Sequence, residues 1–357
     1  MVQPSHAAIA PAERLASFCE RIFLAIGADA GTARDATAAM MHGSVHGVDS
    51  HGVRLLPHYI TVMRKGRVNP TPSLAFAQIR PGSGLLDADH AHGARAAYSA
   101  MDHACEMARR TGIAAVGVRH ASHFGPAGAF TLRAAERGLI GIAVCNSDSF
   151  VRLHDGAAPF HGTNPFSMAV PGGGDHPWLL DMATSSVPFN RVQLYQSTGE
   201  RLPLGVASGR DGKEITDPHD FAMLDPVGGA FGFKGAGLAG VAEILSAVLT
   251  GMRLSPEILP MGGPDLSTPR DLGAFVIVLD PDGFVGAPIM AEGMTRYMAL
   301  LRGSAPREGA RVMAPGDREW EEARRRRAKG IPIDPVTRDG MAALSAEFGV
   351  ALPFDTA

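Results

Sequence analysis

The stretch at residues 40–53, MMHGSVHGVDSHGV, concentrates side chains that can transfer protons or bind a metal. These side chains belong to His42, His46, Asp49, Ser50 and His51. Histidine titrates near neutrality, so it can take up or release a proton at pH 7. The stretch therefore allows three interpretations: a metal site, a proton-transfer loop, or a polar helix end without chemistry.

The metal interpretation rests on His42 and His46, which are four positions apart and would share one face of a helix. With Asp49 as a third ligand, they could hold zinc. However, the chain has no H-E-x-x-H pattern, and Gly43 and Gly47 weaken the helix that the pair would need. Metal binding is therefore the least favoured of the three interpretations.

The composition predicts a globular protein with a large core. A length of 357 residues suggests two or three domains, and 45% of the residues are hydrophobic while 19% are charged. A net charge of -3 gives no reason to expect nucleic acid or an anionic membrane as a partner. The three cysteines are widely spaced and lack a CxxC pattern, so neither a disulfide framework nor a structural zinc site is indicated. The chain shows no signal-peptide pattern and no membrane-spanning run, which predicts a cytoplasmic location.

Apolar residues at helical spacing predict three helices in the first part of the chain. One covers residues 11–26, a second starts after Thr32 and runs into the histidine stretch, and a third covers about 56–65. Asp49–His51 would then lie in a loop between two helices, where side chains can face a cleft. This placement favours the proton-transfer loop over the structural cap.

From about residue 85 the pattern alternates between helices and strands. The predicted helices cover 94–111, 126–138, 236–250 and 317–330, and the predicted strands 112–120, 139–147, 166–171, 177–185 and 274–280. The helix at 317–330 is expected to be the last. It carries Arg324–Arg327 behind Glu321 and Glu322, a spacing typical of a solvated helix face.

The segment Gly235–Gly240, GAGLAG, fits the dinucleotide-binding pattern G-x-G-x-x-G. That pattern has physical meaning only after a strand and with a ribose-binding acid about 20 residues later. Here it follows a Gly-rich segment, so a Rossmann unit is disfavoured. Lys234 nevertheless precedes a predicted helix N-terminus, which favours anions such as phosphate.

His51 and His123 are the natural candidates for proton transfer, since each follows a serine in a loop before a helix. Adjacent Ser-His pairs do not form a nucleophilic triad, and the chain has no G-x-S-x-G elbow. The residues alone therefore predict an enzyme cleft with proton-transfer histidines and several cofactor-like loops.

Taken together, the loops resemble the malate/L-lactate dehydrogenase family of the non-Rossmann type. This family also includes ureidoglycolate, sulfolactate and diketogulonate oxidoreductases and cyclic imino-acid reductases. The resemblance covers nearly the whole chain, in the order of the family. It is carried by GVDSHGVRLLPHY (47–59), SHFGPAGAF (122–130), GTNPFSMAVP (162–171), DMATS (181–185) and GFKGAGLA (232–239).

The resemblance implies an α/β non-Rossmann nicotinamide-binding fold with a mixed sheet, plus a helical domain built from both chain termini. The expected divisions are an N-terminal helical part (1–80), an NAD(P)-binding domain (81–290) and C-terminal helices that pack back on the first part (291–357). It also implies a homodimer.

The resemblance assigns roles residue by residue. His123 matches the general base of the hydroxyacid oxidisers, and Ser50 and His51 match a pair at the substrate, where the histidine is the proton donor of the imine reducers. No metal is implied, and His42 and His46 are then interpreted as helix-surface residues. The positions expected to bind NAD or NADP are His123, Phe124, Gly125, Pro126, Ala127, Ser147, Asp181, Met182, Ala183, Lys234 and Gly235.

The chain departs from the family pattern at the substrate. Family members commonly carry an arginine where this chain has Leu55, so another cation should bind the substrate carboxylate. The candidates, in order of preference, are Arg54, Arg152 and Arg191, and Thr163 is a further expected substrate contact. In the imine reducers an aspartate stands where this chain has Val192, which argues against imine reduction.

The resulting hypothesis is an NAD(P)-dependent oxidoreductase that interconverts a 2-hydroxy acid and its 2-oxo acid, with histidine as general acid and base. The alternative enzyme is an NADPH-dependent reductase of cyclic imino acids. A binding protein without catalysis and a metal-dependent protein are the alternatives from other classes. The expected partners are the small acid and a second copy of the chain.

Overall fold

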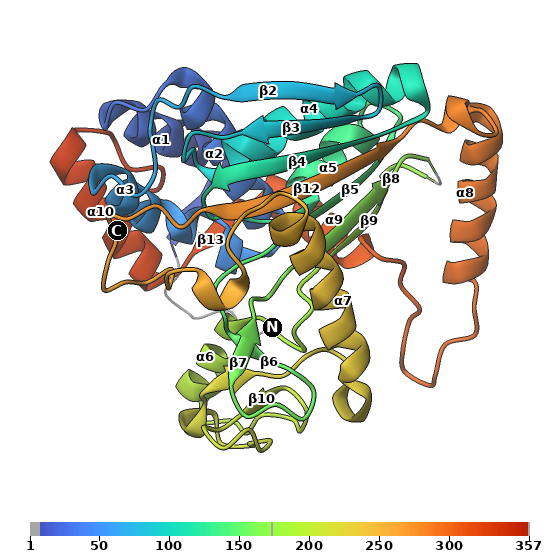
Figure 1. Ribbon diagram of the computed structural model, residues 1–357. Coiled ribbons are helices and arrows are strands. Elements are labelled where there is room, and N and C mark those ends of the chain that lie inside the picture. Colours follow the sequence, from blue (N-terminus) through green and yellow to red (C-terminus); the bar gives the residue numbers. More distant parts are fainter. Residues whose placement is uncertain (1–7, 173, 356–357) are drawn as a thin grey trace.

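A seven-stranded mixed sheet forms the centre of the fold in the computed structural model, which describes residues 8–172 and 174–355 (Figure 1). β3 and β4 run parallel, and the other neighbouring strands run antiparallel. The strand order is β2 (Ala75–Arg80), β3 (Ser83–Asp87), β4 (Ile113–Ala121), β12 (Leu272–Leu279), β5 (Ile140–Cys145), β8 (Phe166–Val170) and β9 (Trp178–Met182).

Helices cover both faces of this sheet. α4 (Gly93–Thr111) and α5 (Gly128–Ala135) lie on one face, where small side chains let the helices approach the strands closely. α7 (Phe233–Glu243) and the π-helical turn Ile244–Val248 that continues it lie on the other face. The main core therefore fills the space between the sheet and α4 and α5.

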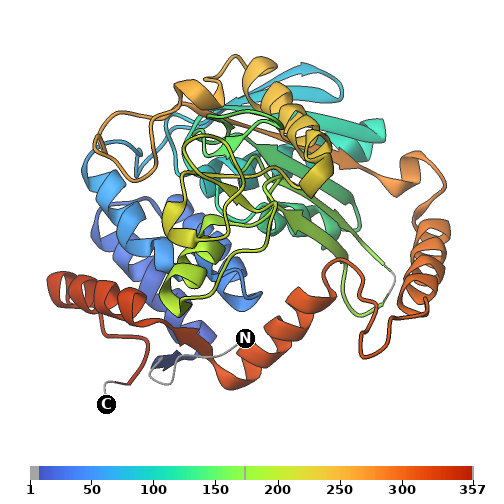
Figure 2. The same ribbon diagram turned by 90° about the horizontal axis from the view of Figure 1, so that it is seen from below.

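A second core is built by helices from both ends of the chain (Figure 2). β1 (Ala8–Ala10) pairs antiparallel with β13 (Ile331–Ile333), which fastens the two ends together. The helices of this unit are α1 (Ala12–Ala25), α2 (Ala30–Val45), α3 (Leu56–Arg64), α9 (Asp317–Lys329) and α10 (Pro335–Phe348). The C-terminal helices thus pack against the N-terminal ones.

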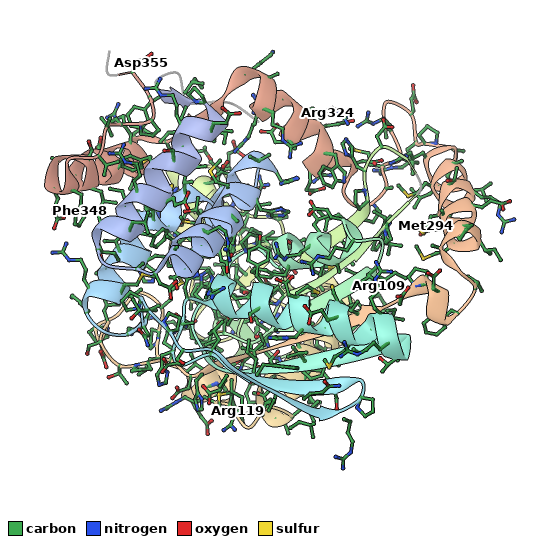
Figure 3. The ribbon with its side chains drawn as sticks, turned by 90° about the horizontal axis from the view of Figure 1, so that it is seen from above. Arg109, Arg119, Met294, Arg324, Phe348 and Asp355 are labelled. Carbon is green, nitrogen blue, oxygen red and sulfur yellow. The ribbon has the colours of Figure 1, made fainter. Side chains whose placement is uncertain are left out.

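Two further parts lie outside these cores. A small four-stranded sheet has the order β10 (Ala207–Ser208), β11 (Met223–Leu224), β6 (Val151–Arg152) and β7 (Pro159–His161), and α6 (Phe189–Thr198) packs beside it. α8 (Ala287–Arg302) stands apart, with Met298 as its buried residue. Figure 3 shows Met294 of α8 and Phe348 of α10 on opposite sides of the molecule.

Several expectations about the helices were wrong. α9 is not the last helix, because α10 follows it, and α6 and α8 were not predicted. α2 starts earlier than expected, since Asp29 is its N-cap and accepts a hydrogen bond from the Thr32 backbone N–H at 2.6 Å. Within the described ranges, no helix is long and apolar enough to cross a membrane.

Candidate active site

One edge of the main sheet gathers the loops that the sequence singled out. Leu272 at the start of β12 pairs with Ala121 at the end of β4, and Ala274 pairs with Cys145 at the end of β5. The loops that begin with Ser122 and Asn146 therefore leave the sheet at the same edge. β8 continues this arrangement, because its first residue pairs with both Val144 and Met182.

His51 and His123 lie next to each other at this edge. Their rings are stacked, with centroids 5.5 Å apart and planes inclined by 27°. The Tyr59 hydroxyl is 2.8 Å from Nδ1 of His123, and the Ser50 hydroxyl is 2.9 Å from Nδ1 of His51. The structure thus brings together the two histidines predicted to transfer protons.

Both histidines are neutral at pH 7. Burial lowers the pKa of His51 to about 4. Burial also holds the pKa of His123 well below its ordinary value, and the proximity of His51 and Arg270 lowers it further. Burial raises the pKa of Tyr59, so its hydroxyl keeps its proton. Each ring is therefore neutral and has one nitrogen without a proton.

Two close backbone approaches position these histidines. A Cβ atom on Gly43 would lie 2.7 Å from the carbonyl oxygen of His51, so only glycine lets α2 contact this turn. A Cβ atom on Gly93 at the start of α4 would lie 2.4 Å from the carbonyl oxygen of Ser122. In the sequence, Gly43 was interpreted as a residue that disfavours a helix. The structure shows that the close contact between α2 and His51 requires glycine at this position.

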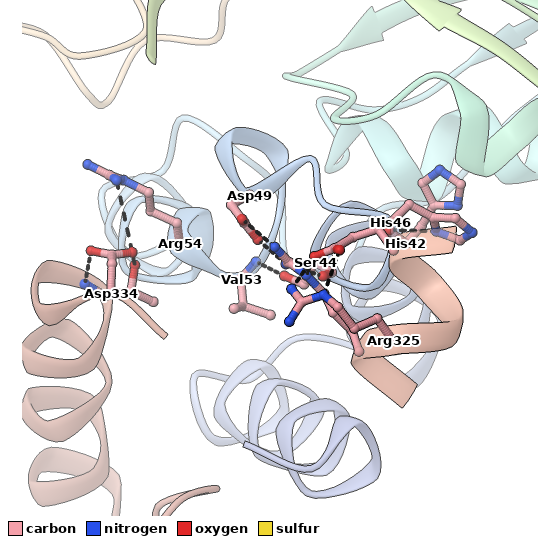
Figure 4. Close-up of polar contacts among 11 residues, drawn as sticks. His42, Ser44, His46, Asp49, Val53, Arg54, Arg325 and Asp334 are labelled. Carbon is pink, nitrogen blue, oxygen red and sulfur yellow. Dashed lines mark hydrogen bonds and ion pairs between the residues drawn. The ribbon is translucent and has the colours of Figure 1, made fainter. Parts of the chain in front are cut away.

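The turn at Asp49–His51 is also held by the C-terminal part of the chain. Arg326 of α9 binds Asp49 with both terminal nitrogens, at 2.5 and 2.9 Å, and donates to the Ser44 carbonyl oxygen at 2.6 Å. Figure 4 shows Asp49, Ser44 and Val53 gathered at this point. Arg326 is 5% exposed, so the prediction that Arg324–Arg327 forms a solvated face was wrong for Arg326.

The expectation that His42 and His46 are helix-surface residues was wrong for His46, whereas His42 is half-buried. His46 is buried and stacks on His42 with ring centroids 4.3 Å apart, and its edge packs on Trp320 of α9. His46 is fixed by a contact from Nδ1 to the His42 carbonyl oxygen at 2.9 Å. In the part of the chain that the structure describes, no cluster of histidine, cysteine or acidic residues is placed to hold a metal ion.

Sequence reasoning missed Tyr59 and His92. Tyr59 lies within the recognised stretch 47–59, but nothing in the sequence showed that its hydroxyl meets a residue 64 positions away. His92 caps α4 by accepting from the Ala94 N–H, and its ring packs edge-on against Tyr59 at 4.2 Å. Burial lowers the pKa of His92 to about 3.

The predicted cofactor-binding residues lie on loops that are linked to one another. Asp181 accepts from the Gly128 N–H at 2.8 Å, and burial raises its pKa to about 6. The Ser147 N–H donates to the side chain of Asn164. Asn164 in turn donates to Glu243 of α7 at 2.8 Å, a buried carboxylate that also accepts from Ser255. Glu243 thereby fixes α7 to the loops at the sheet edge.

The N-terminus of α7 carries Lys234, which the sequence predicted to contact the cofactor. Its N-cap, Gly232, offers no side chain to the free N–H groups, and Lys234 in the first turn is exposed. The G-x-G-x-x-G segment lies inside α7 rather than between a strand and a helix, as expected for a segment that is not a Rossmann fingerprint. A Cβ atom on Gly235 would lie 2.2 Å from the Val227 carbonyl oxygen, so α7 packs directly on the preceding loop.

The predicted substrate contacts are dispersed. Arg54 is 42% exposed and lies 3.9 Å from Asp334, as Figure 4 shows. Arg152 is buried in the small sheet, where its Nε donates to Asp225 at 2.6 Å and to Ser208. Arg191 is exposed on α6, and the carbonyl oxygen of Thr163 accepts from Thr184. Within the described residues, none of the three arginines forms a hydrogen bond or ion pair with His51 or His123.

The comparison with family models decides the assignment, because residues 10–342 match the malate/L-lactate dehydrogenase model. The chain belongs to the malate/L-lactate dehydrogenase family. It is 32% identical over 295 residues to the ureidoglycolate dehydrogenase (NAD(+)) of Escherichia coli O157:H7, covering 82% of this chain and 83% of the relative. It is 30% identical to the (2R)-3-sulfolactate dehydrogenase (NADP(+)) of Chromohalobacter salexigens, covering 89% and 92%.

Solved structures of this family have the same fold. Malate dehydrogenase from Entamoeba histolytica matches with a TM-score of 0.92 and 29% identity, over 98% of this chain and 100% of the other. Δ1-piperideine-2-carboxylate reductase from Pseudomonas syringae matches with a TM-score of 0.84 and 26% identity, over 94% and 99%. The predicted family, fold class, enzyme class and nicotinamide cofactor are confirmed.

Proposed function

We propose that this enzyme interconverts a 2-hydroxy acid and its 2-oxo acid with NAD or NADP, and that His123 is the general acid and base. The observation that carries the proposal is the neutral pair of His51 and His123 at the sheet edge where the cofactor loops meet. A neutral imidazole is the form that accepts the proton of a substrate hydroxyl at pH 7.

Tyr59 fixes how His123 works. With Nδ1 of His123 bonded to the Tyr59 hydroxyl, Nε2 is the atom left to exchange a proton with the substrate oxygen. For Nε2 to accept this proton, the neutral ring of His123 must carry its hydrogen on Nδ1 and donate it to the hydroxyl oxygen of Tyr59. The same hydrogen bond stabilises the positive charge once Nε2 is protonated. The bound nicotinamide supplies the hydride acceptor for oxidation and the hydride donor for reduction.

His51 weakens the binding of a proton by His123. A positive charge on one ring of a stacked pair lowers the pKa of the other, so the pair holds one proton at a time. Ser50 bonds to Nδ1 of His51 and leaves its Nε2 for the substrate. We infer that His51 orients the substrate oxygen while His123 exchanges the proton.

Imine reduction is the alternative, and the kinship with Δ1-piperideine-2-carboxylate reductase supports testing it. Against it, Val192 stands where the imine reducers carry an aspartate, and this valine is fully buried in an apolar cluster. A buried valine offers neither a proton nor a hydrogen bond. The hydroxy-acid reaction is therefore the one we propose.

The test begins with fluorescence titrations of the protein with NADH and NADPH, followed by assays of 2-oxo acids and cyclic imines with each cofactor. We expect one reduced cofactor to bind and at least one 2-oxo acid to be reduced. Binding of neither nucleotide contradicts both enzyme functions. Reduction of cyclic imines without any 2-oxo acid favours the alternative.

We also propose that the enzyme works as a homodimer. α8 is amphipathic, so it has an apolar face. Its apolar residues Ile289, Tyr297 and Leu300 are nevertheless 63%, 50% and 71% exposed to solvent. The turns after α7 expose Val248 and Leu249, each at 62%. Exposed apolar side chains of this kind are typical of protein interfaces, and a second copy of the chain is the simplest partner.

A further inference from the structure

Two arginines, Arg67 and Arg270, are buried, and neither was among the arginines that the sequence suggested. Arg67 and Arg270 are each 2% exposed. Arg270 stands two residues before Leu272, and Leu272 pairs with Ala121, two residues before His123. The strand register therefore places Arg270 at the same sheet edge as His123.

The two arginines differ in what their nitrogens bind. Arg67 uses both terminal nitrogens on backbone oxygens of the segment 260–265, which it holds in place. Arg270 donates from Nε to the Leu259 carbonyl oxygen at 2.8 Å and from Nη2 to Asp148. Among the described residues, Nη1 of Arg270 has no hydrogen-bond partner. Arg270 is therefore held rigidly and keeps one terminal nitrogen for a ligand.

Asp148 gives Arg270 its orientation. It follows Ser147 in the loop after β5, and its second oxygen accepts from the Met261 N–H at 3.1 Å. The carboxylate thus joins β5, the start of β12 and the segment that Arg67 holds. An arginine fixed by a carboxylate presents its remaining N–H groups in a defined plane, which suits recognition of another carboxylate.

The charges around His123 also favour an anion at this point. After burial, the largest influences on its pKa come from groups that are positive or become so, namely His51, Arg270, His92 and His58. Burial and the arginines lower the pKa of His58 to about 4, so this histidine adds no charge at pH 7. Among the permanently charged groups, Arg270 therefore has the largest effect on the pKa of His123.

The arginines suggested by the sequence lack this combination. Arg54 and Arg191 are exposed, so a carboxylate bound there would stay in contact with water. Arg152 already neutralises Asp225 inside the small sheet. A substrate carboxylate that loses its water needs a cation at the site itself, since a desolvated charge without a partner is costly.

We propose that Arg270, oriented by Asp148, binds the carboxylate of the substrate and so places the reacting carbon beside His123. This inference rests on the proposed function, because it supposes a 2-hydroxy or 2-oxo acid as the substrate. Family members commonly carry an arginine where this chain has Leu55. Here Arg270, on a different segment of the chain, would bind the carboxylate instead.

The test compares a 2-oxo acid with its methyl ester, which lacks the negative charge. For Arg270→Gln we expect the KM of the acid to rise about ten- to hundredfold, the scale of a lost charge-assisted hydrogen bond, with a smaller change in kcat. The values for the ester should change little, so the acid-to-ester ratio of kcat/KM falls. Arg54→Gln is the matched control and should leave this ratio unchanged.

Arg270→Lys and Asp148→Asn keep the test decisive if Arg270→Gln does not fold. Arg270→Lys retains the charge but loses the planar fork, so we expect an intermediate ratio, and Asp148→Asn should lower the ratio severalfold. NADH binding in each variant verifies that the fold is intact. An unchanged ratio in the folded variants overturns the proposal, as does an equal loss on acid and ester.

The two proposals fail in different ways. A wild-type enzyme that reduces no 2-oxo acid refutes the proposed function, and the role of Arg270 with it. A wild-type enzyme that reduces the acid, with variants that keep its acid-to-ester ratio, refutes the role of Arg270 alone.

Discussion

Burial sets the protonation state of both Tyr59 and His123. Burial raises the pKa of the Tyr59 hydroxyl and lowers that of the His123 imidazole, so at pH 7 both groups are neutral and share a hydrogen bond of 2.8 Å. A base that is neutral and fixed at one nitrogen loses little freedom when it takes a proton from the substrate.

Replacing His123 tests this assignment directly. We expect His123→Ala to lower kcat by about 10²-fold or more, the scale of a lost general acid–base. The dissociation constant for NADH should change much less, because the other cofactor loops are unaltered. Steady-state kinetics and a fluorescence titration measure the two effects. Near-normal turnover in His123→Ala would move the base to His51.

The sequence predicted the candidate proton-transfer histidines, but it did not predict the residues that hold them in place. His51 and His123 could be chosen because histidine has the right pKa and both lie in loops before helices. Arg326 could not be linked to Asp49, which lies 277 positions earlier, and Arg270 could not be linked to Asp148 across 122 positions. Such pairs depend on how the strands and helices meet.

At the scale of elements, the short turn Asp49–His51 depends on α2 and α9 together. Gly43 lets α2 contact the turn, and Arg326 of α9 binds both Asp49 and the Ser44 carbonyl oxygen. The turn contributes few contacts of its own. Its conformation is therefore set by two helices from opposite ends of the chain.

Arg326→Met should release this turn. We expect kcat/KM to fall about tenfold and stability to fall by about 1–3 kcal/mol, because the Ser44 carbonyl oxygen and Asp49 lose their buried partner. Arg324→Met on the same helix is the matched control, since Arg324 is exposed, as Figure 3 shows. Denaturant unfolding and kinetics on both variants measure the difference. Equal effects in the two variants would contradict the role of Arg326.

The elements themselves were predictable where apolar periodicity is strong. The predicted helix at 94–111 and strand at 274–280 agree closely with α4 and β12, whose buried residues recur at helical and alternating spacing. α8 was not predicted, although Gly286 is its N-cap and Pro288 lies in its first turn, where proline is common. α10 buries only Thr337, Met341 and Leu344, and one of these is polar, so its apolar periodicity is weak.

At the scale of the whole molecule, buried histidines should make stability depend on pH. The pKa values of His51, His58 and His92 are lowered to about 4, 4 and 3, and those of His42 and His123 are also well below the ordinary value. Below pH 6.5 the unfolded chain takes up protons that the folded protein cannot accept. Stability is therefore fully present above pH 6.5 and declines as the pH falls from there.

We expect the midpoint of urea unfolding to fall between pH 6.5 and pH 5, before most carboxylates titrate. Asp181 has the opposite effect on stability. Its pKa is raised to about 6, so the folded protein takes up this proton before the unfolded chain does. This single group is outweighed by the several histidines. Unfolding curves at half-unit intervals measure the slope, and His51→Gln should make the decline shallower. A flat profile over this range would refute the prediction.

The exposed apolar faces predict the assembly. Val248→Glu combined with Leu300→Glu should convert a dimer of the 37.4 kDa chain into monomers, because each substitution places a charge on an apolar contact. Leu204→Glu, at a leucine 70% exposed on another part of the surface, is the control. Size-exclusion chromatography with light scattering gives the mass. A wild-type monomer would overturn the homodimer proposal.

The contact between Asp49 and Arg326 has a consequence for biosynthesis. A ribosome makes the chain from its N-terminus, and domains begin to fold as they emerge. The turn that carries His51 is made early, whereas α9 appears only after the main sheet is complete. A nascent chain that has just finished β12 thus holds every strand of the sheet and both histidines, yet its histidine turn is not fixed. Full activity is then acquired only after α9 has been made, so a chain that ends at β12 would convert the substrate more slowly than the complete chain.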